Sequence, residues 1–139
     1  MNFKAGMLAA LLMASLSATP VWAHGDGAPQ PVDTTGLEPL GEDWRPVNPY
    51  RGNEKAIEIG ARGYNSNCAR CHGLDAKSGG MAPDLRALEP NDDGDAWFLT
   101  RIRMGARRND RVKMPPFEGL ISQEAMWAIR SYIDAQPDD

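Results

Sequence analysis

Two cysteines and a histidine stand close together near the middle of this 139-residue chain, in the run Cys68-Ala69-Arg70-Cys71-His72. This C-x-x-C-H spacing is the attachment pattern of a covalently bound c-type haem. The two thiols suit thioether bonds to the haem vinyl groups, and the adjacent imidazole suits a proximal iron ligand. Because Cys68 and Cys71 are the only cysteines, the sequence predicts one haem c with His72 as axial ligand.

The same spacing has three other interpretations. A redox dithiol of this pattern belongs to a βαβ fold, and no such alternation is visible in the chain. A structural zinc site needs four Cys or His ligands, whereas the chain offers two of each, and His24 is far from the motif. A disulfide between the two cysteines suits an oxidising compartment. The adjacent histidine and the export signal favour haem attachment.

Residues 1–23 have the pattern of a secretory signal peptide. Lys4 precedes an apolar stretch over about residues 5–16, and Val21-Trp22-Ala23 is a small-x-small cleavage pattern. An uncleaved N-terminal anchor is the alternative. No later segment is long or apolar enough for a membrane helix. We therefore expect a soluble periplasmic protein without stable membrane insertion.

Cleavage after Ala23 leaves 139 − 23 = 116 residues, enough for one small domain. Without Lys4 the mature chain has 14 basic and 19 acidic residues, a formal charge of −5. A mildly acidic chain is a poor candidate for nucleic-acid binding. An N-terminal His24 suits copper, but a copper site needs a second histidine, and His72 is already assigned.

Three zones follow the signal peptide. Residues 24–52 are rich in proline, glycine and polar side chains, which predicts an extended N-terminal segment. We expect its first part to be mobile and residues 44–50 to lie on the domain surface. Residues 53–136 form the haem domain, and residues 137–139 are a short C-terminal tail.

The haem domain contains three helical patterns, which predict an all-α fold packed around one covalent haem. The first pattern covers residues 53–67, with Asn53 as N-cap and an apolar face of Ile57, Gly60, Ala61, Tyr64 and Cys68. The second covers residues 95–104 with Asp95 as N-cap, and the third covers residues 122–135 with Ser122 as N-cap. Gly60 costs a helix about 1 kcal/mol against alanine, which predicts that another helix crosses closely there.

These features together resemble class I cytochrome c. Gly60, Tyr64 and Cys68 match the glycine, aromatic residue and first cysteine of that family's N-terminal helix, and Ile129 with Tyr132 resembles its C-terminal aliphatic–aromatic pair. The segment Ala82-Pro83-Asp84-Leu85 resembles the family's G-P-x-L segment. The resemblance implies that the Pro83 carbonyl accepts a hydrogen bond from His72 Nδ1–H and orients the ring.

A narrower resemblance concerns the electron donor. Residues 48–53, the Asn-Cys-Ala-Arg-Cys-His-Gly-Leu run and the Met-Pro-Pro-Phe-Glu-Gly run at 114–119 resemble one subgroup of the family. Its members are periplasmic cytochromes that accept electrons from pyrroloquinoline-quinone (PQQ)-dependent alcohol dehydrogenases. The resemblance implies such a dehydrogenase as donor and a terminal oxidase or another cytochrome as acceptor.

The second axial ligand is sought among four methionines outside the signal peptide: Met81, Met104, Met114 and Met126. Met81 belongs to the proximal loop, while Met104 and Met126 lie on helical patterns where methionine usually packs in the core. Met114 precedes two prolines, which stiffen its loop and reduce the entropy lost on ligation. Met114-Pro115 also resembles the family's distal motif. We therefore expect Met114 on the iron, with Met104 as the next choice.

Ligation by one histidine and one methionine fills both axial positions and suits an electron carrier rather than an enzyme. We expect a monomeric one-electron carrier. The alternatives are a general respiratory shuttle with another donor and a haem enzyme or gas sensor with an open distal site. Residues 101–113 hold six basic side chains against one acidic one. Three interpretations of these basic side chains are open: a solvated face, ion pairing with a haem propionate, and electrostatic steering of a partner.

Overall fold

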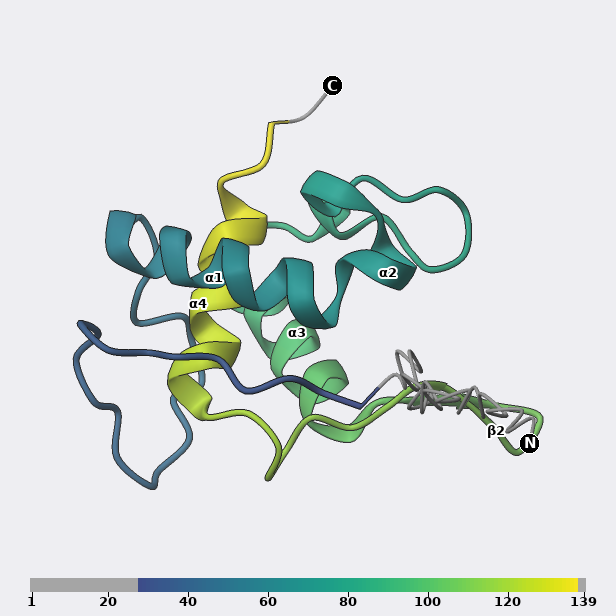
Figure 1. Ribbon diagram of the computed structural model, residues 1–139, viewed down its shortest axis with the longest axis horizontal. Coiled ribbons are helices and arrows are strands. Elements are labelled where there is room, and N and C mark those ends of the chain that lie inside the picture. Colours follow the sequence, from purple (N-terminus) through teal and green to yellow (C-terminus); the bar gives the residue numbers. More distant parts are fainter. Residues whose placement is uncertain (1–27, 138–139) are drawn as a thin grey trace, which may run out of the picture.

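The computed structural model describes residues 28–137, so the predicted signal peptide, its cleavage site and His24 lie outside the described residues. Two long helices cross near the centre, a third lies behind them, and a hairpin extends toward one end of the molecule (Figure 1). The elements run in the order α1 (Glu54–Asn67), α2 (Ala69–His72), η1 (Leu74–Ala76), η2 (Leu85–Ala87), α3 (Asp92–Met104), β1 (Ala106–Arg108), β2 (Arg111–Met114) and α4 (Gln123–Asp134).

Helix α1 begins and crosses its neighbour as predicted. The Asn53 side chain accepts a hydrogen bond from Ala56 N–H at 3.0 Å, which caps the helix. A Cβ added at Gly60 would lie 1.9 Å from the Ala128 carbonyl oxygen of α4, so the backbones of the two helices touch at this glycine. The tight crossing fixes the direction in which α1 carries its C-terminal end toward Cys68.

Helix α4 supplies most of the core. Ser122 is its N-cap, as predicted, and accepts a hydrogen bond from Ala125 N–H at 3.1 Å. Its buried apolar side chains recur at helical spacing and include Ala125, Met126, Ile129, Tyr132 and Ile133. The rings of Tyr132 and Tyr64 on α1 lie 5.2 Å apart between their centres, which extends the helix crossing with an aromatic contact.

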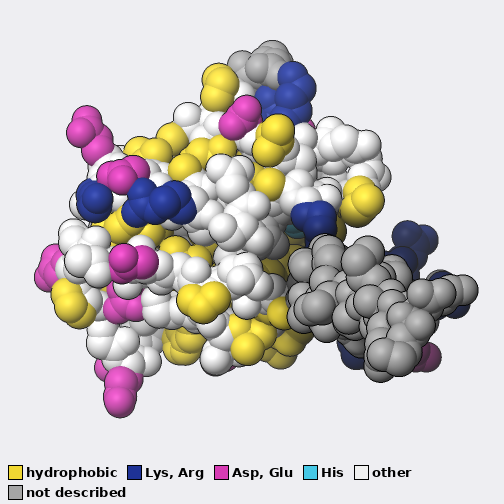
Figure 2. Space-filling view, viewed as in Figure 1, with side chains coloured by type: hydrophobic (Ala, Val, Ile, Leu, Met, Phe, Trp, Pro, Cys, Tyr) yellow, Lys and Arg dark blue, Asp and Glu magenta, His cyan; other side chains and the backbone are white. Residues whose placement is uncertain are grey.

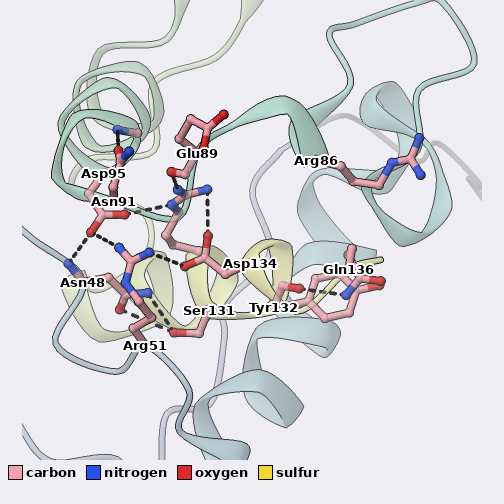
Figure 3. Close-up of polar contacts among 12 residues, drawn as sticks. Asn48, Arg51, Arg86, Glu89, Asn91, Asp95, Ser131, Tyr132, Asp134 and Gln136 are labelled. Carbon is pink, nitrogen blue, oxygen red and sulfur yellow. Dashed lines mark hydrogen bonds and ion pairs between the residues drawn. The ribbon is translucent and has the colours of Figure 1, made fainter. Parts of the chain in front are cut away.

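The prediction of Asp95 as the N-cap of α3 is wrong. Asn91 caps the helix by accepting from Gly94 N–H at 3.0 Å, and Asp95 lies one turn inside it. The Asp95 carboxylate is fully buried and pairs with Arg130 Nε at 2.9 Å, in a network that Figure 3 shows. Burial alone would raise the pKa of Asp95, but hydrogen bonds from the Asn48 N–H, Arg130 and Arg51 lower it below its ordinary value.

The segment before α1 packs against the helices. Leu40 N–H donates to Glu124 Oε1 at 2.8 Å, and Asn48 N–H donates to Asp95 Oδ2 at 2.8 Å. The expectation that residues 44–50 lie on the surface is wrong for Asn48 and Tyr50, which are 7% and 5% exposed. Buried donors and acceptors along this segment therefore bind it to α3 and α4.

The all-α prediction is correct for the core and wrong for residues 106–114. Strands β1 and β2 pair antiparallel, with Ala106 opposite Met114 and Arg108 opposite Arg111. Asn109 and Asp110 both have positive φ angles, of 50° and 58°, as a two-residue hairpin turn requires. Among residues 28–137, no helix has both the length and the apolar character needed to cross a membrane.

Candidate haem-binding site

The Cys-x-x-Cys-His segment forms the junction between α1 and α2. Cys68 ends α1 with its N–H on the Tyr64 carbonyl at 2.7 Å, and its own carbonyl accepts from His72 N–H at 2.9 Å. One short helical turn therefore presents both sulfurs and the imidazole. Both cysteines are free and partly buried. Burial and the neighbouring Cys71 raise the pKa of the Cys68 thiol to about 12, whereas a reactive redox dithiol has a lowered pKa.

The orientation of the His72 ring follows from one contact. Its Nδ1 lies 2.8 Å from the Pro83 carbonyl oxygen. A carbonyl only accepts hydrogen bonds, so the ring proton is assigned to Nδ1 and the lone pair to Nε2. This is the arrangement in which a histidine binds a metal through Nε2 while a second group fixes its tautomer. The contact agrees with what the family resemblance implied for Pro83.

Two tyrosines hold the loop that follows His72. Tyr64 Oη donates to the Gly73 carbonyl at 2.7 Å, and Tyr132 Oη donates to Asp75 Oδ1 at 3.1 Å. Gly73 has a φ of 83°, and a Cβ there would lie 1.9 Å from the Lys77 carbonyl oxygen, so only glycine fits. The sequence identified both tyrosines as core aromatics, but it gave no signal for these two hydroxyl contacts.

The far part of this loop is fixed around Pro83. Ser78 Oγ donates to the Ala82 carbonyl, and Ser78 N–H donates to Asp84 Oδ2 at 3.2 Å. Arg86 donates to both oxygens of Asp84, from Nε at 3.0 Å and from Nη2 at 2.9 Å. These contacts lie on both sides of Pro83, so its carbonyl is held where it meets the His72 ring.

Met114 lies at the end of β2, and the hairpin determines its place. A Cβ added at Gly105, whose φ is 70°, would lie 2.4 Å from the Met114 carbonyl oxygen. The Met114 side chain is partly buried against the core. Strand β2 and helix α2 lie toward the same end of the long axis of the molecule (Figure 1). Met114 is thus anchored in a segment separate from the one that carries His72.

The other methionines occupy different environments. Met126 is fully buried in the core of α4, as expected for a packing residue. The expectation that Met104 packs in the core is wrong, because its side chain is 71% exposed. Met81 is 78% exposed in the loop after His72. Of the four methionines, Met114 alone combines partial burial with a backbone fixed by a strand pair.

The donor set fits haem c. It consists of two free thiols three residues apart, an imidazole whose Nε2 is left for a metal, and a thioether on a separate segment. Apolar side chains reach the surface of the face in Figure 2, and large ones in the segments around the site are exposed, namely Leu74, Met81, Met104 and Val112. Such apolar surface suits contact with a flat apolar macrocycle.

Some basic side chains of residues 101–113 contact the protein, and the others are exposed to solvent. Arg101 Nη1 donates to the Gly105 carbonyl at 3.3 Å, and Arg103 forms a bidentate pair with Glu118. Arg107 Nη2 donates to the Asp110 carbonyl at 2.8 Å across the hairpin turn. The remaining basic side chains of the hairpin are exposed, namely Arg108, Arg111 and Lys113. The hairpin therefore presents a positively charged surface beside the segment that carries Met114.

Comparison with known proteins gives a consistent result. Residues 55–133 match the family model described as cytochrome c oxidase, cbb3-type, subunit III. The chain is 56% identical over 133 residues to cytochrome c550 of Pseudomonas aeruginosa, covering 93% of this chain and 89% of that protein. It is 37% identical over 103 residues to the quinohemoprotein alcohol dehydrogenase ADH-IIG of Pseudomonas putida, covering 73% of this chain and 14% of that protein.

A solved structure of that dehydrogenase, from Pseudomonas putida HK5, aligns with 70% of this chain and 14% of its own chain, with a TM-score of 0.48 and 37% identity. The cbb3-type cytochrome c oxidase subunit FixP of Rhizobium meliloti is 33% identical over 89 residues, covering 56% of this chain and 29% of that subunit. This chain therefore spans nearly all of one relative and a minor part of the others.

Proposed function

We propose that this chain, which belongs to the family described as cytochrome c oxidase, cbb3-type, subunit III, shuttles electrons in the periplasm. Its proposed donor is a PQQ-dependent alcohol dehydrogenase. Family membership and the cytochrome c550 homologue show that the protein is a c-type electron-transfer cytochrome with covalent haem c, not an enzyme. The donor, the acceptor and the location are the proposal.

The bound haem supplies a one-electron iron couple, and the residues of this chain hold it. We assign Cys68 and Cys71 to the thioether bonds that would hold the haem, and His72 Nε2 and Met114 would be the protein ligands of its iron. The contact of 2.8 Å between His72 Nδ1 and the Pro83 carbonyl carries this assignment, because it leaves Nε2 as the only free ring nitrogen. With two protein ligands on the iron, oxygen and peroxide would find no open site.

The alcohol dehydrogenase as donor is supported by the match to ADH-IIG. A segment of that quinohemoprotein alcohol dehydrogenase is 37% identical to this chain, although the match covers 14% of its length. The match suggests that a domain of this kind works beside a quinoprotein dehydrogenase within one polypeptide. We propose that the present chain performs the equivalent transfer as a separate molecule, with a terminal oxidase or another cytochrome as acceptor.

Stopped-flow reduction of the purified ferric protein tests the donor. The protein is mixed with a PQQ-dependent alcohol dehydrogenase from the same organism, with and without its alcohol. Rapid reduction that depends on the alcohol is the expected result. If the haem is reduced by dithionite but not by the dehydrogenase, the donor is wrong and a general respiratory shuttle explains the protein better.

The ligand assignment has its own test. The ferric protein should show the long-wavelength Fe–S(Met) absorption band, and Met114→Ala should lose it while Met104→Ala keeps it. A ferric protein without this band would instead favour an enzyme or gas sensor with an open distal site.

We also propose that the protein is a monomer. Its proposed parts are an extension at 24–52, a haem domain at 53–136 and a tail at 137–139.

A further inference from the structure

Three side chains from separate segments meet just beyond Met114: Trp44 before α1, Arg103 in the last turn of α3, and Glu118 after β2. We propose that they form a clamp that holds the Met114 loop, residues 114–117, closed against the core. The inference rests on the proposed function, in which Met114 is the second iron ligand. Trp44 and Arg103 are then positioning residues, which act on iron ligation through Met114.

The guanidinium group of Arg103 makes contacts through both its edge and its face. Its Nε donates to Glu118 Oε2 at 3.0 Å and its Nη2 donates to Glu118 Oε1 at 2.8 Å, a bidentate pair. Its guanidinium carbon lies 4.1 Å from the centre of the Trp44 ring. The hydrogen bonds from Arg103 hold the pKa of Glu118 below its ordinary value, so the carboxylate stays charged at neutral pH. The planar guanidinium of Arg103 is pre-organised for this bidentate pair, so the side chain loses little conformational entropy when the pair forms.

The Met114 loop depends on anchors at its two ends. At the first end Ala106 pairs with Met114, and Gly105 makes room for the Met114 carbonyl. At the second end Phe117 N–H donates to the Ile102 carbonyl at 2.9 Å. Between these ends stand two prolines, Pro115 and Pro116, which have no N–H to donate. The loop therefore has no backbone donors between its two anchors, and the neighbouring side-chain clamp compensates.

Trp44 links this clamp to the N-terminal segment. Beside it, Arg45 N–H donates to Gln123 Oε1 at 2.6 Å, and Leu40 N–H donates to Glu124 Oε1 at 2.8 Å. Both acceptors lie in the first turn of α4, which is part of the core. The segment is thus fixed independently of the Met114 loop, and Trp44 gives Arg103 an aromatic surface to pack on. The N-terminal segment thereby contributes to iron ligation without touching the iron.

Displacement of Met114 by imidazole measures how readily the loop opens. Imidazole binds only when the thioether has left the iron, so its apparent dissociation constant falls as the open fraction rises. We expect Arg103→Gln to bind imidazole about tenfold more tightly than wild type, since both contacts are lost. Trp44→Leu removes the ring contact and Glu118→Gln removes the charge of the pair, and we expect about a threefold change for each.

The matched control is Arg62→Gln, which breaks an exposed arginine–glutamate pair, Arg62 Nη1 to Glu58 Oε1 at 2.6 Å, on α1. It should leave imidazole affinity unchanged. Circular dichroism and haem content per chain establish that each variant is folded and loaded.

The two proposals fail in different ways. A wild-type protein that lacks the Fe–S(Met) band overturns the ligation on which the clamp depends. A wild type with the band, together with an Arg103→Gln variant whose imidazole affinity matches wild type within twofold, overturns the clamp alone. An equal change in Arg62→Gln also overturns it, because the effect would then be a general response to lost charge.

Discussion

The helix crossing at Gly60 leads to a sharp test of the fold that positions the haem site. In Gly60→Ala, the new Cβ would lie 1.9 Å from the Ala128 carbonyl oxygen and 2.9 Å from Tyr132 Cβ. The nearest atom is backbone, so it cannot move aside as a side chain does. Helices α1 and α4 must separate, and the packed side chains along the crossing lose part of their dispersion contacts.

The magnitude follows from two opposing contributions. Overpacking in a core costs typically 1–3 kcal/mol, and a clash with backbone belongs at the upper end, about 3 kcal/mol. Replacing glycine by alanine within a helix stabilises the helix by about 1 kcal/mol. The free energy of unfolding should therefore fall by about 2 kcal/mol, roughly thirtyfold in the unfolding equilibrium.

Gly63→Ala is the matched control, since it makes the same change three residues later in α1. The new Cβ would meet side-chain atoms, Ile129 Cγ1 at 3.1 Å and Val32 Cγ2 at 3.2 Å, which need to move only slightly. Its unfolding free energy should stay within about 1 kcal/mol of wild type. The assay is guanidinium unfolding of the haem-loaded protein, followed by circular dichroism. Equal stabilities of the two variants would refute the argument that backbone contact at Gly60 fixes the crossing.

Three further predictions test the surroundings of the site. Asp95→Asn removes one of the two carboxylates that pair with the buried Arg130 guanidinium, the other being Asp134, and should cost about 3 kcal/mol at pH 7 by urea unfolding. Because the folded pKa of Asp95 is lowered, its contribution is present above the ordinary value of about 3.9 and is lost as the pH falls through the folded value. The variant should therefore lose less stability than wild type between pH 5 and pH 3; an equal loss would contradict this. Tyr64→Phe leaves the Gly73 carbonyl without its donor and should cost about 1–2 kcal/mol in the same unfolding assay. Arg107→Glu combined with Arg108→Glu should slow reduction by the donor at low salt and flatten the salt dependence; unchanged rates would exclude steering by the hairpin.

Local chemistry was readable from neighbouring residues. The spacing of Cys68, Cys71 and His72 sets which groups share one helical turn, and Asn53 and Ser122 cap helices through contacts with residues three positions on. Asn109-Asp110 was an available signal that the sequence analysis missed, because both residue types tolerate the positive φ of a hairpin turn. A local pattern also misled, because Asn91, Asp92, Asp93 and Asp95 are all residue types that cap helices, and the cap is the first of them.

Burial and long-range contact decided the remainder. Nothing in the local sequence distinguishes Met104, which is 71% exposed, from a core methionine, or shows that Asp95 is enclosed by arginines from other segments. The contact between Arg103 and Trp44 joins residues far apart in the chain. The sequence by itself determined the haem-attachment chemistry and most of the helices, because these depend on spacing and on hydrogen bonds within one turn. Only the tertiary structure decided how the Pro83 carbonyl reaches His72 and which side chains meet beside the Met114 loop, because these contacts arise only when distant segments pack together.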